Sequence, residues 1–370
     1  MTTILTRAPQ QQDYLMWCDE VRPVCGSCRR KGEDCRITSA SDTPLHSPGC
    51  QCQGAADNVF NIEDLRLLSH WLSGDGNFFA DHDASIAKKE RERQLELAFS
   101  HPCLLHTLLA IAALDLFSHN STKEMFYTQA TSHYITALRL AQPELSTSQG
   151  EAHSESLFLF SAFSSLYAFA EPPLRLVNTT NNDQFSAVDE LLKAFGMGRG
   201  IVAISSSHSA DLEQILETQS RNWPDEPTEL VGSLDTTAWP LLDLLRLIRE
   251  HQDYSDLPKQ MLSEAVTQLF AVIALLQQHN TDHSSARHIM SWPMHIDQSI
   301  IELWQIKEPV SMLVLAHYAV MIDLRRNIWF FERWPRLLFE DISKYLYKDG
   351  GQWDLYLEWP RKMILQNQNK

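Results

Sequence analysis

The stretch HPCLLHTLLAIAALDLFS, residues 101–118, decides the fold of this 370-residue chain. It opens with a His-Pro pair, and proline suits the first turn of a helix because the N–H group that it lacks has no partner there. The apolar part of the stretch is interrupted by His106 and Asp115. A membrane span needs ~20 apolar residues, so this shorter run predicts a helix buried in a protein core, and no membrane span.

Helical patterns continue on both sides of this stretch. Apolar residues recur at helical spacing within residues 64–72, and Gly74 ends the pattern. Further helices are predicted at 122–141, 153–170, 184–204, 209–219, 238–250, 257–279, 295–305, 309–330, 334–347 and 353–365. Residues 171–183, with two prolines and a run of Asn and Thr, are expected to form an exposed loop. Alternation typical of strands is nearly missing, so we expect a mainly α protein that is all-helical over 59–370.

The charge of the chain is distributed unevenly. Residues 1–52 contain six basic and six acidic side chains, whereas the remaining residues contain 25 basic and 41 acidic ones and so carry the whole net charge of −16. An acidic body is repelled by nucleic acid, so any contact with DNA is expected to come from the N-terminal segment. The acidic body itself is interpreted as a solvated surface.

Six of the seven cysteines fall within the first 52 residues. A secreted disulfide protein would spread them through the fold, and no secretory signal is visible, so the crowding points to metal binding in a reducing compartment. Four of them have the spacing C-x6-C-x2-C-x6-C: Cys18, Cys25, Cys28 and Cys35. Zinc prefers tetrahedral thiolate sites, and a C-x2-C turn directs two sulfur atoms at one metal. Cys50 and Cys52 are interpreted as thiols of a linker without a metal role.

Basic residues adjoin these cysteines. Arg29, Arg30 and Lys31 follow Cys28 directly, where positive charge favours thiolates and is available to phosphate groups. The domain organisation predicted from the sequence has four parts. It consists of a disordered N-terminus (1–17), a partial zinc-cluster segment (18–35), a flexible Ser-, Pro- and Gly-rich linker (36–58) and the helical body (59–370). The linker has no heptads, so no coiled coil for dimerisation is expected there.

The cysteine segment resembles the fungal six-cysteine binuclear zinc-cluster family. Cys18-Asp19, Arg22-Pro23-Val24-Cys25, Cys28 and Cys35 are similar to the second half of that pattern, and Pro23 corresponds to its loop proline. The resemblance implies a zinc cofactor held by the four cysteines, promoter DNA as the partner, a nuclear location and a possible homodimer. The residues expected to contact DNA are Arg22, Arg29, Arg30 and Lys31.

The first half of the family pattern is absent from this sequence. Its two cysteine ligands would occupy positions that hold Ala8 and Gln11, and residues 10–17 contain no Lys or Arg. Two metals that share six thiolates cannot form from four. We expect either that the natural protein contains an upstream exon that completes the cluster, or that the domain is degenerate and DNA binding is lost.

The helical body resembles the regulatory domain of fungal regulators similar to sterol uptake control proteins. Several stretches carry this resemblance: Asp64–Trp71, Ala98–His106, Ala110–Leu114, Trp292-Pro293, Glu308-Pro309, Leu315–Val320 and Trp329. The resemblance implies a helical bundle that binds a hydrophobic ligand. Phe158, Phe163 and Tyr167 are the candidate pocket residues, and packing in the core is the alternative interpretation of the same aromatic spacing.

No enzyme motif is persuasive, so no catalytic residue is predicted. The run Gly196–Gly200 lacks the G-x-G-x-x-G spacing and is interpreted as a turn between helices. The pair His279 and His283 is interpreted as surface histidines. The sequence therefore predicts a zinc-dependent, sequence-specific transcription regulator of a fungal metabolic pathway, either sterol uptake or a secondary-metabolite gene cluster. The alternative is a helical ligand- or partner-binding regulator that has lost DNA binding.

Overall fold

Helices account for all the regular secondary structure in the described part of the chain, as the sequence predicted. The computed structural model describes residues 62–73, 84–144, 151–178, 185–205, 238–278, 285–349 and 351–366. Contacts divide the chain after Val59, and every described residue lies in the second unit, 60–370. The prediction of a mainly α fold is confirmed there. The cysteine segment, the linker and the predicted helix 209–219 lie outside the described residues.

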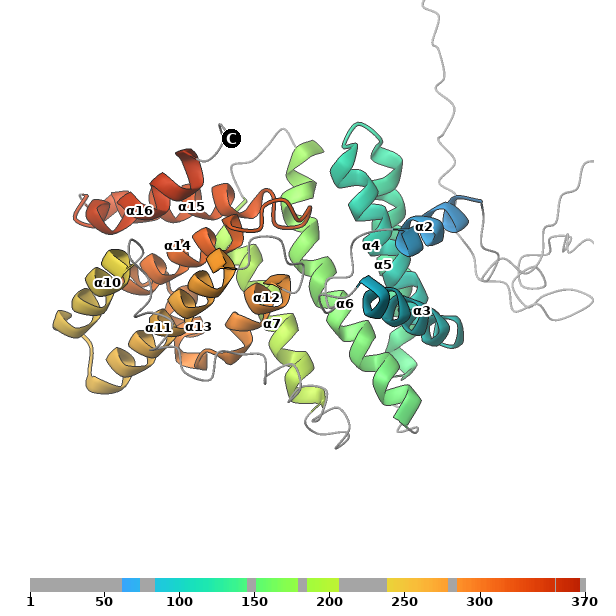
Figure 1. The fold of residues 1–370 in the computed structure, drawn as a ribbon, viewed down its shortest axis with the longest axis horizontal. Helices are drawn as coiled ribbons and strands as arrows, with labels where there is room; N and C mark the ends of the chain where they lie inside the picture. Colours follow the sequence, from blue (N-terminus) through green and yellow to red (C-terminus); the bar gives the residue numbers. More distant parts are fainter. Residues whose placement is uncertain are drawn as a thin grey trace, which may run out of the picture. The chain divides into compact units, whose positions relative to one another are not determined.

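Five helices form the first part of this unit, and four of them surround the apolar fifth. They are α2 (Ile62–Ser73), α3 (Ala84–Ser100), α4 (Pro102–His119), α5 (Glu124–Glu144) and α6 (Glu151–Arg175), which η1 (Leu176–Asn178) follows. Helix α4 packs against all the other four, most extensively against α5 (Figure 1). Its side chains are buried on nearly every side, so α4 is the core helix that its composition predicts.

The second part is arranged around another enclosed helix. Its elements are α7 (Ala187–Ser205), α10 (Ala238–Glu250), α11 (Asp256–Gln278), α12 (Ser285–His295), α13 (Gln298–Gln305), α14 (Pro309–Asp323), α15 (Trp334–Leu346), η2 (Tyr347–Asp349) and α16 (Asp354–Gln366). Helix α14 is buried from Val310 to Asp323 and contacts α10, α11, α13, α15 and α16 (Figure 1). Helix α7 packs against α6, so the buried apolar residues of both parts form one continuous core.

The beginning of α14 follows from its sequence. Glu308 is the N-cap residue, and its carboxylate accepts hydrogen bonds from the backbone N–H groups of Val310 (3.1 Å) and Ser311 (2.7 Å). Pro309 occupies the first turn, as proline at the start of a helix often does. This cap fixes the position of the helix that carries His317.

Several predicted boundaries are wrong. The charged helix α3 was not predicted, because its run of Lys, Glu and Arg hides the few buried residues, Leu95 and Ala98 among them. Helix α12 was not predicted either, and the predicted helix 295–305 corresponds to α13, which begins at Gln298. The predicted helix 309–330 ends at Asp323, where successive i→i+3 backbone bonds replace the helix. There the buried Arg325 donates to the carbonyl of Leu276 on α11, an interaction that sequence periodicity cannot reveal.

Two further corrections concern proline and glycine. Helix α6 continues through Pro172 and Pro173 to Arg175, within the predicted loop. The run Gly196–Gly200 lies inside α7 and is not a turn between helices. Gly198 is there because of close packing: a Cβ atom at this position would lie 2.5 Å from Met294 Cε of α12 and 3.1 Å from Ser165 Oγ of α6.

Two described helices are long and apolar enough to cross a membrane, namely Pro102–His119 of α4 and Asp256–Gln277 of α11. Both pack within the helical unit with more than half of their residues buried. This is the usual environment of a core helix, so their composition is explained without a membrane.

Candidate functional site

The predicted zinc and DNA residues cannot be placed in the structure. The four cysteines at 18, 25, 28 and 35 lie outside the described residues, and so do Arg22, Arg29, Arg30 and Lys31. His279 and His283 also lie outside them. Within the described ranges, no cluster of three or more His, Cys, Asp or Glu side chains is arranged to hold a metal ion.

The aromatic residues proposed for a ligand pocket lie on α6. Phe163 is buried and makes an edge-to-face contact with Trp71 of α2, with 5.4 Å between ring centroids. Tyr167 is buried and stacks on Tyr134 of α5 at 3.9 Å. Phe158 is half-buried against the same core. Phe163 and Tyr167 thus make packing contacts between helices, and their role in binding a ligand stays a prediction.

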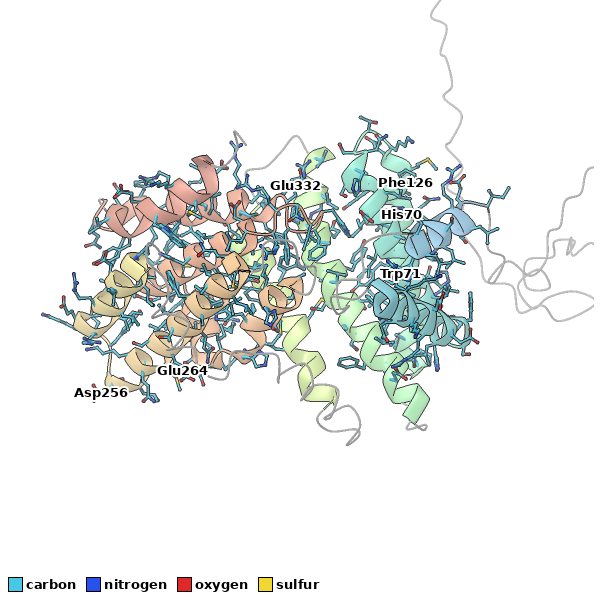
Figure 2. The ribbon with its side chains drawn as sticks, viewed as in Figure 1. His70, Trp71, Phe126, Asp256, Glu264 and Glu332 are labelled. Atoms are coloured by element: carbon cyan, nitrogen blue, oxygen red, sulfur yellow. The ribbon has the colours of Figure 1, made fainter. Side chains whose placement is uncertain are left out.

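Ionisable side chains join α2 to α4 and α5. His70 Nε2 lies 2.8 Å from Asp115 Oδ2, while His133 Nε2 lies 3.3 Å from Asp64 Oδ1. The Nδ1 atoms of His106 and His133 are 2.8 Å apart, so one of them must be protonated and the other must accept. Burial lowers the pKa of both rings, which agrees with this neutral arrangement. Figure 2 shows His70 and Trp71 on α2.

A cavity lies between α10, α14 and α16, in the second part of the helical unit. Its volume is about 250 Å³, and its lining is Pro240, Asp243, Leu244, His317, Leu355, Tyr356, Glu358, Trp359 and Lys362. Apolar and aromatic side chains make up most of the wall. The charged side chains of the lining come from α10 and α16, and Glu358 and Lys362 of α16 are exposed to solvent.

His317 is the buried polar residue of this cavity. Its Nδ1 atom lies 2.8 Å from the backbone oxygen of Leu313, one helical turn earlier. A carbonyl can only accept a hydrogen bond, so Nδ1 carries the proton and Nε2 holds a lone pair. Burial lowers the pKa of His317 to about 4, because the charged ring would be desolvated, and the backbone bond opposes this only in part. The ring is therefore neutral near pH 7.

Aromatic rings hold the imidazole of His317 in place. Trp359 stacks on it with 5.3 Å between centroids and an interplanar angle of 19°, and Phe270 of α11 lies 5.7 Å away. Phe270 and Trp359 also stack on each other at 5.7 Å. Because three rings from three helices pack together, the orientation of His317 is fixed, and Nε2 is the polar atom that it can offer to the cavity.

Charged side chains of both signs lie at the edge of the cavity. Asp243 pairs with Arg246 at 3.5 Å on α10, and Glu358 and Lys362 lie on α16. Burial raises the pKa of Tyr356, and the carboxylates of Asp243 and Glu250 raise it further, so the phenol stays protonated. The cavity is thus an aromatic site with one neutral acceptor inside and carboxylates near its edge.

Sequence reasoning did not identify this cavity. It placed His317 and Trp359 in two separate predicted helices, 309–330 and 353–365, and the two residues are 42 positions apart and share no motif. The signal that was available is the position of His317 as the only basic side chain in the apolar run Val310–Ile322. A histidine in such a run has to be held neutral or neutralised by a partner.

Comparison with known proteins gives one match. Residues 84–166 match the family described as "fungal specific transcription factor domain". The matched stretch extends from α3 through α4 and α5 into α6, which is the first part of the helical unit. The segment is similar to that family, and the similarity supports a fungal transcription regulator as the class of this chain. No curated protein matches the sequence. The cavity at His317 and the cysteine segment lie outside the matched residues.

Proposed function

We propose that this chain is a nuclear, zinc-dependent and sequence-specific DNA-binding transcription regulator, with the helical unit as its regulatory domain. The observation that carries the proposal is the match of residues 84–166 to a fungal transcription factor domain, on a chain that also has the C-x6-C-x2-C-x6-C spacing. The two features lie in different parts of the chain. A metabolic pathway, either sterol uptake or a secondary-metabolite gene cluster, is the proposed target.

Zinc is proposed to bind to the thiolates of Cys18, Cys25, Cys28 and Cys35. Four thiolates satisfy one tetrahedral zinc, whereas a binuclear cluster needs the two further ligands that Ala8 and Gln11 do not provide. This proposal is tested by measuring the zinc content of the purified chain and of a version extended upstream. We expect one zinc in the first and two in the second. Two zinc ions in the shorter chain would contradict the proposal.

DNA is proposed to contact Arg22, Arg29, Arg30 and Lys31, because the rest of the chain is acidic. The test is selection of bound duplexes from a randomised pool by the extended protein. Replacing Cys25 and Cys28 with serine should abolish binding, whereas replacing Cys50 and Cys52 should leave it intact. Each lost phosphate contact should also reduce the slope of log K against log salt by about 1. Failure of the extended protein to select any sequence would refute DNA binding.

The second candidate function is a ligand-responsive helical regulator that does not bind DNA. The cavity with a buried acceptor at His317 favours it. The two candidates differ in outcome: zinc uptake with selection of a DNA sequence supports the first, while ligand binding with no DNA selected by either chain supports the second. Phe158, Phe163 and Tyr167 are retained as a proposed second ligand region on α6.

A further inference from the structure

The cavity between α10, α14 and α16 has a size that restricts its occupant. A cavity of 150 Å³ accommodates benzene, while pockets for drug-sized ligands have roughly 300–1,000 Å³. The volume of about 250 Å³ lies between these limits. A molecule of two fused rings fits this space, whereas a ligand with a long chain or several more rings would extend into solvent.

The walls define the chemistry of most of the occupant. Trp359 and Tyr356 present aromatic surface, and Leu244 and Leu355 present aliphatic surface. A planar apolar molecule would gain dispersion and hydrophobic contacts with all four. Asp243, Glu358 and Lys362 lie at the edge, and Asp243 is paired with Arg246, so the charges balance there and a neutral molecule is favoured.

The buried end of the cavity demands a hydrogen-bond donor. Nδ1 of His317 is already bonded to the Leu313 carbonyl, and none of the described residues supplies a hydrogen-bond partner for Nε2. An unprotonated ring nitrogen accepts one hydrogen bond. An apolar ligand without a donor would displace water and leave this acceptor unsatisfied, which costs free energy.

We propose that this cavity binds a neutral, bicyclic aromatic molecule whose single N–H or O–H group donates a hydrogen bond to Nε2 of His317. The inference concerns the helical unit alone and does not rest on zinc or DNA binding. It uses residues outside the stretch that matches the transcription factor domain. The site is also distinct from the aromatic residues of α6.

The experiment compares two probes, indole and 1-methylindole, on the full 370-residue chain by isothermal titration calorimetry and by ligand-observed NMR. The probes have nearly the same shape, but only indole has an N–H donor. Indole should bind, and 1-methylindole should bind about tenfold more weakly, since the acceptor is left unpaired. Equal affinities, or no binding of indole up to its solubility limit, would overturn the proposal.

Variants identify the site of binding. His317→Phe keeps the ring stack but removes the acceptor, so it should abolish the preference for indole. Leu355 is 68% exposed, so Leu355→Trp can close the entrance without disturbing the core, and it should weaken both probes at least tenfold. The matched control is Leu257→Trp on α11, which is 60% exposed and does not line the cavity. Unchanged affinity in Leu355→Trp places the probe elsewhere and refutes the site, even if His317→Phe fails to fold.

Because neither zinc nor DNA is present, this result is independent of the proposed function. Indole binding by a chain that selects no DNA would support the cavity and refute DNA binding. DNA selection without indole binding would support DNA binding and refute the cavity proposal.

Discussion

The indole nitrogen of Trp334 donates a hydrogen bond of 2.8 Å to the backbone oxygen of Phe169, which lies 165 residues earlier in the chain. Phe169 precedes Pro173 by four positions in α6, and proline has no N–H group for the usual i→i−4 bond. Trp334 therefore supplies the donor that Pro173 lacks. This bond compensates for the second of the two prolines through which α6 continues.

The first prediction tests that explanation with a double-mutant cycle. Trp334→Phe should lower the free energy of unfolding by about 1–3 kcal/mol, because it leaves a buried carbonyl without a donor and removes part of a buried ring. Pro173→Ala restores an N–H group at the right position. In that background, Trp334→Phe should cost about 1 kcal/mol less. Urea denaturation measures both, and an equal cost in the two backgrounds would show that the proline is irrelevant to the bond.

The same relationship occurs in α12. The hydroxyl of Tyr318 donates to the carbonyl of Ile289 at 3.1 Å, four residues before Pro293. Tyr318→Phe keeps the stacking on Trp292 and removes only the donor, so it should lower the free energy of unfolding by about 1–2 kcal/mol. The loss should be smaller when Pro293 is replaced by alanine. A larger loss in the Pro293→Ala background would contradict the assignment.

The third prediction compares two glycines of α7. Gly196 is exposed and an added Cβ would meet nothing within 4 Å, so Gly196→Ala should raise the free energy of unfolding by about 0.5–1 kcal/mol. At Gly198 the Cβ would lie 2.5 Å from Met294 Cε and 2.9 Å from Met294 Sδ, so the end of that side chain would have to shift. Gly198→Ala should therefore be less stable than Gly196→Ala by about 1 kcal/mol or more. Equal stability of the two variants would show that the close approach of Met294 to α7 does not require a glycine at position 198.

The fourth prediction concerns pH. His317 has its pKa lowered by burial from 6.5 to about 4, so the unfolded chain binds this proton at a higher pH than the folded one. Its contribution to stability is complete above pH 6.5 and is lost as the pH falls towards 4, by up to about 3 kcal/mol. Replacing His317 with phenylalanine should remove this dependence, whereas His295→Phe, at an exposed site, should not.

Urea denaturation at pH 7 and pH 5 makes this comparison. The difference between wild type and His317→Phe should change by about 2 kcal/mol over that interval. Asp323 has the opposite effect on the pH dependence of stability. Burial raises its pKa to about 6, and Arg326 offsets this rise only in part. The test therefore compares the free energy of unfolding of the variants with that of the wild type at each pH, and does not use the wild-type pH curve alone. An identical pH dependence in the two proteins would mean that His317 is accessible to protons in the folded state.

The sequence by itself determined the helical class of the body and identified α4 as a core helix. The apolar run of residues 101–118 begins with proline and is too short for a membrane, so it has to be enclosed by other helices, and α4 is so enclosed. It also determined the cysteine spacing and the acidic charge of residues 53–370, which limit where DNA could bind. These properties are local or compositional, so no partner residue is needed to recognise them.

Only the tertiary structure decided which local rules are overruled. Pro173 and Pro293 lie inside helices in which Trp334 and Tyr318 supply the donors that the prolines lack. The sequence predicted a turn at Gly198, which instead packs inside α7 beside Met294. The site at His317 has the same origin, since His317 and Trp359 come together only when α16 packs on α14. Each of these cases depends on a hydrogen bond or a contact between distant residues. Sequence periodicity describes one helix at a time, so it determines the helices, and their packing determines the cavity.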